Sequence, residues 1–421
     1  MYIYFLFIRL AALLGHKKAQ LMVMGQRSIE MTGTRLTVLG KEVPHHAIWI
    51  HAASVGEFEQ ARPLIERIRR YRPQEKIVVT FFSPSGYEMR KNYPLADAVL
   101  YLPFATRRNA KAFIEALQPQ MAIFVKYEFW PAYLHELKRR DIPTYSISAI
   151  FRPGQLFFQW FGKWHLELLR CFTYIYVQDE SSLDLLHRHG IPQAGIAGDT
   201  RFDRVHDVME GLKADNERLA PVTLFTEGCE RVIVAGSTWP KDEELLAHYC
   251  HEYKDRFPDK PAKMIIVPHE IDEAHLHFLF NLFKGRIVRY SQVYNQPIGI
   301  QQHLLSYANV MVIDTMGLLS SIYRFGQVAY IGGGFGVGIH NTIEAAVYGM
   351  PVIFGPNYQH FREAKGLIAV GAGRSIRQYA ELEIAFDTAL EQHKTIGAKA
   401  AEYVQSELGA TDKIYKEIFL N

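Results

Sequence analysis

Short apolar segments alternate along this chain with longer segments in which apolar residues recur at helical spacing. The short segments are continuous runs of Val, Ile and aromatic residues, which is typical of strands covered on both faces of a parallel sheet. The alternation predicts an α/β fold with doubly wound parallel sheets. The predicted strands span residues 47–51, 76–82, 98–103, 121–125, 143–149, 174–177, 231–235, 264–267, 286–290, 309–313, 328–331 and 352–354.

A polar helical segment from Glu210 to Leu219, followed by Pro221, separates the first six strands from the last six. The length of 421 residues is enough for two domains with separate cores. We therefore predict two α/β domains of about 200 residues each, facing one another across a cleft.

The N-terminus is unusually apolar. Residues 2–8 are continuously apolar, Arg9 interrupts the run, and residues 10–14 resume it. The run is shorter than the roughly 20 residues of a spanning helix, and it lacks the flanks of a secretory signal. We predict an uncleaved helix that lies on or dips into a membrane, with Arg9 reaching the headgroups. Packing against the protein's own core is the alternative.

The overall charge is nearly balanced. Hydrophobic residues make up 48% and charged residues 22% of the chain, and the net charge of +3 is too small to indicate a nucleic-acid partner. Basic residues nevertheless cluster, which indicates either a solvated face or an anionic partner such as a membrane surface. They are Arg62, Arg67, Arg69, Arg70, Arg72, Arg90, Lys91, Arg107, Arg108 and Lys111.

Three cysteines, Cys171, Cys229 and Cys250, are far apart and follow no metal-binding or redox spacing. They predict free thiols in a reducing compartment.

The segment His51-Ala-Ala-Ser-Val-Gly-Glu57 contains the first candidate catalytic residue. A strand runs into a turn of small residues, and helical spacing follows from residue 58, so Glu57 should lie in the first turn of a helix. Ligands of parallel α/β sheets bind beyond this edge. Glu57 is therefore either a general base or a carboxylate that favours a helix N-terminus. Glu128, in Lys126-Tyr-Glu-Phe-Trp-Pro131, follows another strand to the same edge.

Residues 332–346 form a second distinctive segment, in which five glycines separate a strand from a helix expected near Asn341. Glycines let the backbone approach a ligand, and N–H groups at a helix start attract phosphate. Asn341 and Glu344 also fit a capping box, which does not explain the glycines. We predict a phosphate or nucleotide site here, although the loop has neither a P-loop nor a dinucleotide-binding spacing.

Other strand ends point to the same kind of site. Three of them should line one edge of the second sheet and complete a nucleotide-binding site. In the first half, residues 198–203 bring charges to the corresponding edge. His269, Glu270 and His275 lack the spacing of zinc ligands on one helical face, so we predict no metal site. The three strand ends are Ala235-Gly-Ser-Thr-Trp239, Pro268-His-Glu270 and Asp314-Thr-Met-Gly317.

Together these segments resemble the bacterial Kdo transferases, which add 3-deoxy-D-manno-octulosonic acid (Kdo) to lipid A precursors. The resemblance covers nearly the whole chain, and segments 51–57 and 332–344 are its most specific parts. It implies a GT-B glycosyltransferase fold with two Rossmann-like domains and an N-terminal membrane-associated helix. The implied parts are this helix (1–24), an acceptor-binding domain (25–218), a nucleotide-sugar-binding domain (219–399) and a C-terminal helix that crosses back (400–421).

The resemblance also implies roles for individual residues. Glu57 corresponds to the general base and Glu128 to a second acidic position near the reaction centre. For the donor CMP-Kdo, the resemblance implies that Met316 and Gly317 contact the cytidine and that Glu344 contacts the ribose. It implies that Asn341 and Ser237 contact the phosphate and that Arg201 contacts the sugar carboxylate. His269 and Gly336 are implied to line the same site.

The implied reaction is an inverting transfer of Kdo to a lipid A precursor in lipopolysaccharide biosynthesis, without a metal or other cofactor. The implied location is the cytoplasmic side of the inner membrane. Another GT-B glycosyltransferase that uses a UDP-sugar, a nucleotide-sugar epimerase and a non-catalytic membrane scaffold are the alternatives.

Overall fold

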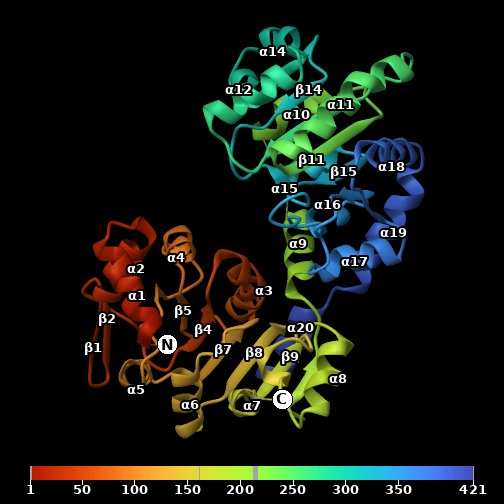
Figure 1. Ribbon diagram of the computed structural model, residues 1–421. Coiled ribbons are helices and arrows are strands. Elements are labelled where there is room, and N and C mark those ends of the chain that lie inside the picture. Colours follow the sequence, from red (N-terminus) through yellow and green to blue (C-terminus); the bar gives the residue numbers. More distant parts are fainter. Residues whose placement is uncertain (1, 161, 212–216, 421) are drawn as a thin grey trace. The chain divides into compact units, whose positions relative to one another are not determined.

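The structure is a computed structural model that describes residues 2–160, 162–211 and 217–420 (Figure 1). It divides into two compact units, Met1–Arg204 with Glu407–Asn421, and Val205–Ser406. The chain thus passes between the units at 204/205, within helix α9 (Thr200–Gly211), and at 406/407. The boundaries expected from the sequence lay at 218/219 and 399/400.

The first unit is built on a seven-stranded parallel sheet in the order β10-β9-β8-β7-β4-β5-β6. Alternate residues of β4 enter different cores: Trp49 packs against Phe113 and Tyr133, whereas Ile50 joins the core that contains Phe58. Burial on both faces explains the continuous apolar runs. The strands are β4 (Ile48–Ala52), β5 (Ile77–Phe81), β6 (Ala98–Tyr101), β7 (Met121–Val125), β8 (Thr144–Ala149), β9 (Tyr174–Val177) and β10 (Ala194–Ile196).

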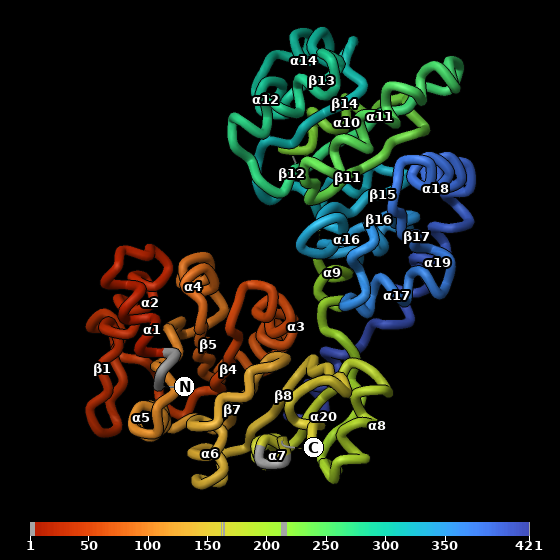
Figure 2. The backbone as a smooth tube through the Cα atoms, viewed as in Figure 1, coloured from red at the N-terminus to blue at the C-terminus, as the bar shows by residue number. Residues whose placement is uncertain are grey.

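Helices cover both faces of this sheet (Figure 1). The last helix of the chain, α20, packs against α3 within the first unit. Figure 2 shows α20 as a blue segment among the elements of this unit. The helices are α3 (Val55–Tyr71), α4 (Pro84–Arg90), α5 (Arg107–Leu117), α6 (Pro131–Arg139), α7 (Lys163–Leu169), α8 (Glu180–Arg188), α20 (Ala410–Phe419) and the 3-10 turn Leu156–Phe158.

The N-terminal segment forms α1 (Tyr2–Leu13) and α2 (Lys17–Arg27), followed by a small sheet of β1 (Ile29–Thr32), β2 (Arg35–Val38) and β3 (Lys41–Glu42). Phe5 of α1 is buried and stacks on Phe104, with ring centroids 4.5 Å apart. Leu10 and Leu13 are exposed. Within the described ranges, no helix combines the length and the apolar character needed to cross a membrane. The predicted membrane-associated helix gains no support from this finding.

The second unit contains another seven-stranded parallel sheet, in the order β13-β14-β12-β11-β15-β16-β17. Leu246, Leu279 and Phe386, from helices α11, α12 and α18, enter the core on one of its faces. The strands are β11 (Val232–Thr238), β12 (Lys263–Pro268), β13 (Ile287–Arg289), β14 (Val310–Val312), β15 (Val328–Ile331), β16 (Val352–Phe354) and β17 (Gly373–Ser375).

The helices of this unit surround the sheet (Figure 1). They are α10 (Ala220–Thr226), α11 (Pro240–Arg256), α12 (Glu273–Leu282), α13 (Tyr290–Val293), α14 (Ile298–Leu305), α15 (Leu319–Ile322), α16 (Ile343–Ala346), α17 (Arg362–Ala369), α18 (Tyr379–Glu391), α19 (His393–Ser406) and the 3-10 turns Glu217–Leu219 and Tyr323–Phe325.

The doubly wound α/β architecture is confirmed, and all twelve predicted strands are present. The strands that the sequence did not predict, β1–β3, β10 and β17, have two to four residues and include Lys, Glu, Arg or Gly. Such segments lack a continuous apolar run.

Candidate active site

Glu57 lies where β4 gives way to α3, in the first turn of the helix, as predicted. Ser54 caps this helix: its Oγ accepts from the Glu57 N–H at 3.4 Å, and Glu57 Oε2 accepts from the Ser54 N–H at 3.0 Å. This reciprocal pair fixes the carboxylate at the carboxyl edge of the sheet. Burial, and next the charge of Glu128, raise the pKa of Glu57 above its usual value, while His51 and the Ser54 N–H act in the opposite direction.

A buried histidine, His51, contacts Glu128, one of the two carboxylates that the sequence predicted. His51 Nε2 lies 3.2 Å from Glu128 Oε2, and its Nδ1 lies 2.8 Å from Thr80 Oγ1. Trp130 Nε1 donates to Glu128 Oε2 at 2.6 Å, and Trp49 Nε1 donates to Thr80 Oγ1 at 2.8 Å. Glu128 is thus held by hydrogen bonds beside Glu57, whose pKa it affects.

Asp199 and Arg201 form a second charged group at the carboxyl edge of this sheet, after β10. Asp199 is buried and accepts from Gln60 Nε2 at 2.9 Å and from Arg201 Nε at 2.8 Å. Burial alone would raise the pKa of Asp199, but the charge and hydrogen bonds of Arg201 hold it below its usual value. Arg201, predicted to contact the donor, is therefore fixed by an ionised carboxylate in the first unit.

The strand ends predicted to form a nucleotide-binding site lie on adjacent strands of the second unit, which are β14, β12, β11 and β15. Their aromatic side chains meet: Trp239 stacks on His269 at 4.8 Å, and His269 lies 4.5 Å from His340. Trp239 Nε1 lies 3.3 Å from His340 Nε2. Burial, and next the charge of His269, lower the pKa of His340 to about 4, so His340 is neutral at physiological pH.

The glycine loop approaches the backbone of neighbouring strands closely. A Cβ on Gly332 would lie 2.2 Å from the Ser237 carbonyl oxygen, and one on Gly334 would lie 2.6 Å from Gly355 Cα. Ser237 itself adopts a left-handed conformation with φ +53°. The buried carboxylate of Asp242 accepts from the Gly333 N–H at 2.9 Å. Glycine is thus required at 332 and 334 for packing.

The helix expected after this loop is much shorter than the prediction assumed, because α16 has four residues and its cap is Thr342. The N–H groups of Gly336, Gly338 and His340 donate to carbonyls of the loop itself, so they are not free for a phosphate. Asn341 Oδ1 accepts from the Ile343 N–H at 3.1 Å, and Asn341 Nδ2 donates to Glu344 Oε1 at 2.9 Å. This is a local turn and not the reciprocal capping box considered above.

The remaining predicted donor residues lie on the same edge. Met316 is 75% exposed, and Gly317 follows it with φ +83°. Gly336 is exposed at the tip of the glycine loop. The sequence did not single out Thr342, next to Asn341, whose buried hydroxyl has no hydrogen-bond partner within the described part of the chain.

No group of three or more His, Cys, Asp or Glu side chains is arranged to hold a metal in the part of the chain that the structure describes. His275, weighed above as a ligand, instead lies 2.7 Å from Glu243 Oε2.

Comparison with known proteins shows what this chain is similar to. Residues 30–204 match the family model described as 3-Deoxy-D-manno-octulosonic-acid transferase (kdotransferase). The chain is 28% identical to the 3-deoxy-D-manno-octulosonic acid transferase of Chlamydia trachomatis serovar A, over 81% of this chain and 77% of that protein. The transferase of the same description from Aquifex aeolicus is 25% identical, over 80% of this chain and 84% of that protein.

Solved structures show the fold. A UDP-GlcNAc 2-epimerase from Neisseria meningitidis aligns with a TM-score of 0.65 and 16% identity, over 89% of this chain and all of that chain. MurG from Acinetobacter baumannii aligns with a TM-score of 0.54 and 10% identity, over 90% of this chain and all of that chain. These alignments confirm the predicted GT-B architecture of two Rossmann-like domains.

Proposed function

We propose that this chain, a glycosyltransferase related to the Kdo transferases, transfers Kdo from CMP-Kdo to a lipid A precursor with Glu57 as the general base. The observation that carries the proposal is a half-buried glutamate of raised pKa at the carboxyl edge of the first sheet, next to a second carboxylate. A carboxylate with a raised pKa is a better proton acceptor near neutral pH.

The reaction is a single displacement. Glu57 accepts the proton of an acceptor hydroxyl, the hydroxyl oxygen forms a bond to the anomeric carbon of Kdo, and the bond from that carbon to the phosphate oxygen breaks. CMP leaves with the electron pair, and the anomeric configuration is inverted. Fixed dipoles can stabilise this leaving group, so we propose that no metal is needed and that EDTA leaves the rate unchanged.

The donor lies at the carboxyl edge of the second sheet. In this proposal the nucleotide contacts Met316 and Gly317, and Glu344 accepts from ribose hydroxyls. Asn341 and Ser237 face the phosphate, and His269 and Gly336 line the same edge. Arg201 binds the sugar carboxylate, a role that suits a guanidinium already oriented by Asp199.

Glu57→Gln tests the base, because it keeps the shape of the side chain and removes the proton acceptor. We expect turnover of CMP-Kdo and tetraacylated lipid A precursor to fall by about 10²–10⁴-fold, measured by product mass, with CMP-Kdo binding unchanged. Glu66→Gln, on the same helix and in a half-buried ion pair with Arg62, is the matched control and should retain activity. Full activity of Glu57→Gln would refute the assignment.

A glycosyltransferase that uses a UDP-sugar is the nearest alternative. We expect CMP to raise the melting temperature of the protein more than UDP does at equal concentration. A larger shift with UDP would favour the alternative, and no shift with either nucleotide would favour a non-catalytic scaffold.

A further inference from the structure

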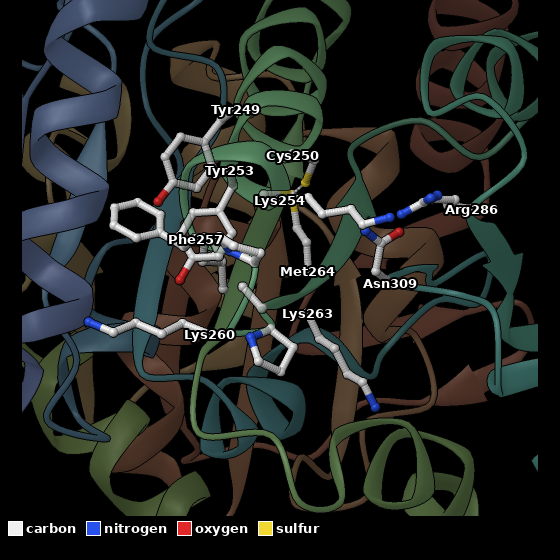
Figure 3. Close-up of a pocket in the computed structure, with 14 residues that line it drawn as sticks. Tyr249, Cys250, Tyr253, Lys254, Phe257, Lys260, Lys263, Met264, Arg286 and Asn309 are labelled. Atoms are coloured by element: carbon white, nitrogen blue, oxygen red, sulfur yellow. Dashed lines mark hydrogen bonds between the residues drawn. The ribbon is translucent and has the colours of Figure 1, made fainter.

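A pocket lies at the amino edge of the second sheet (Figure 3). The residues of this unit proposed for the donor lie at the opposite, carboxyl edge of this sheet. The pocket has a volume of about 200 Å³ and lies between α11, the loop that follows it and the starts of β12 and β14. A cavity of about 150 Å³ is known to hold benzene, so this pocket has room for one six-membered ring.

One side of the pocket is aromatic. Tyr249, Tyr253 and Phe257 follow one another with centroid separations of 5.4 and 4.9 Å. The two phenol groups already have partners, since Tyr249 donates to Asp387 at 2.8 Å and Tyr253 accepts from Arg231 at 3.0 Å. The Arg256 guanidinium lies over the Tyr249 and Phe257 rings, 5.5 and 5.1 Å from their centroids, so Tyr253 is the aromatic wall that remains for a flat ligand.

The other side of the pocket is basic. Figure 3 shows Lys254, Arg286 and Asn309 together on this side. Among the described residues, neither the Lys254 nor the Arg286 side chain has a hydrogen-bond or ion-pair partner. No Asp or Glu is among the described residues that line the pocket. Cys250 lines it too, and burial raises the pKa of this thiol to about 12, so no thiolate balances the two cations.

Asn309 lines the pocket next to these two cations. Its Oδ1 atom is buried and has no hydrogen-bond partner among the described residues, so the side-chain amide is free to turn its Nδ2 donor toward an anionic ligand. A second hollow of about 330 Å³ shares Cys250, Lys254, Arg286 and Asn309 with the pocket. Lys284 and the carboxylate of Asp255 also line this hollow, so its lining has more cations than anions and suits an anionic group next to the ring.

We propose that this pocket binds an aromatic phosphate monoester, with the ring between Tyr253 and Met264 and the phosphate between Lys254 and Arg286. A phosphate monoester carries close to two negative charges at neutral pH, and its terminal oxygens accept from both cations and from the side-chain amide of Asn309. A carboxylate carries one negative charge and two oxygens, so it satisfies these donors less completely. The site is separate from the donor site because it lies at the other edge of the sheet.

Isothermal titration of the full-length protein with phenyl phosphate tests the proposal. We expect saturable binding that is tighter than binding of benzoate or inorganic phosphate, and that persists when CMP is present at saturation. Lys254→Ala/Arg286→Ala should weaken binding about tenfold or more, and Ala262→Phe should abolish it by filling the pocket without removing a charge.

Lys394→Ala, which removes an exposed lysine of α19, is the matched control and should bind phenyl phosphate as the unmodified protein does. Thermal unfolding of each variant shows that it is folded. Equal binding by the double variant, displacement by CMP, or no binding by the unmodified protein at about 1 mM ligand would each overturn the proposal.

Discussion

At the scale of single residues, Glu57 has two roles that the sequence presented as alternatives. Its capping hydrogen bonds orient the side chain at the helix start, and its burial next to Glu128 makes the proton acceptor stronger. The cap is therefore compatible with the proposed base, because the same local geometry presents the carboxylate beyond the end of β4.

The pH dependence of transfer follows from this environment. A general base works only when deprotonated, so the rate should fall as the pH drops through the pKa of Glu57. Because burial and Glu128 raise this pKa, the fall should begin at a higher pH than for an ordinary glutamate. His51 lowers the same pKa, so His51→Asn should move the acid limb of kcat/KM further toward high pH.

The measurement is a pH–rate profile of the unmodified protein and of His51→Asn. His45→Asn is the control, because His45 contacts the Ala116 carbonyl, away from the carboxylates, and its profile should not move. An acid limb of His51→Asn that stays in place or moves to lower pH would contradict this role of His51.

Glu57 could be predicted as a site residue from the sequence and His51 could not, for a physical reason. Ser54 and Glu57 are three residues apart, so their contact is local and readable from spacing. The contact of His51 with Thr80 depends on the register between β4 and β5, where these two residues are paired. No spacing along the chain encodes that register.

At the scale of elements, the glycines at 332 and 334 let the loop pack closely against other backbone segments. Gly332 lies against the backbone of residues 237 and 238, which cannot move aside without distorting β11. The sequence indicated close approach of backbone and ligand, whereas the closest approach in the structure is between two parts of the protein. The loop length and the four-residue α16 depend on tertiary packing and could not be predicted from glycine spacing.

Gly332→Ala should therefore reduce stability strongly. We expect the free energy of unfolding to fall by about 3 kcal/mol, because the added Cβ would overlap backbone atoms. Gly336→Ala, in the same loop, has no atom closer than 4.0 Å to the added Cβ and should change this free energy by less than about 1 kcal/mol. Denaturant unfolding of the two variants compares them, and equal losses would show that the overlap is relieved.

At the scale of the whole molecule, α1 and α2 present an apolar surface to solvent with basic residues beside it. Leu6, Leu10 and Leu13 are 67%, 50% and 84% exposed, and Arg9 and Lys17 accompany them. An exposed surface of this kind suits an interface with anionic lipids. We propose that it contacts the inner membrane, where a lipid A precursor would be reached from the cytoplasmic side.

Leu10→Glu/Leu13→Glu tests this contact without disturbing a buried residue. We expect co-sedimentation with vesicles containing phosphatidylglycerol to fall about tenfold, because two apolar side chains become anionic. Ile298→Glu/Ile300→Glu, which changes two exposed apolar residues of α14, should co-sediment as the unmodified protein does. Unchanged vesicle binding of the first variant would place the contact elsewhere.

The return of α20 to the first unit has a consequence for biosynthesis. Ile414 belongs to the same core as Ile65 of α3, so that core is complete only when the last residues have left the ribosome. At usual elongation rates, synthesis of residues 205–406 delays this step by roughly 10–40 s. During that interval the nascent first unit exposes apolar surface on α3, and this surface is what a chaperone would bind.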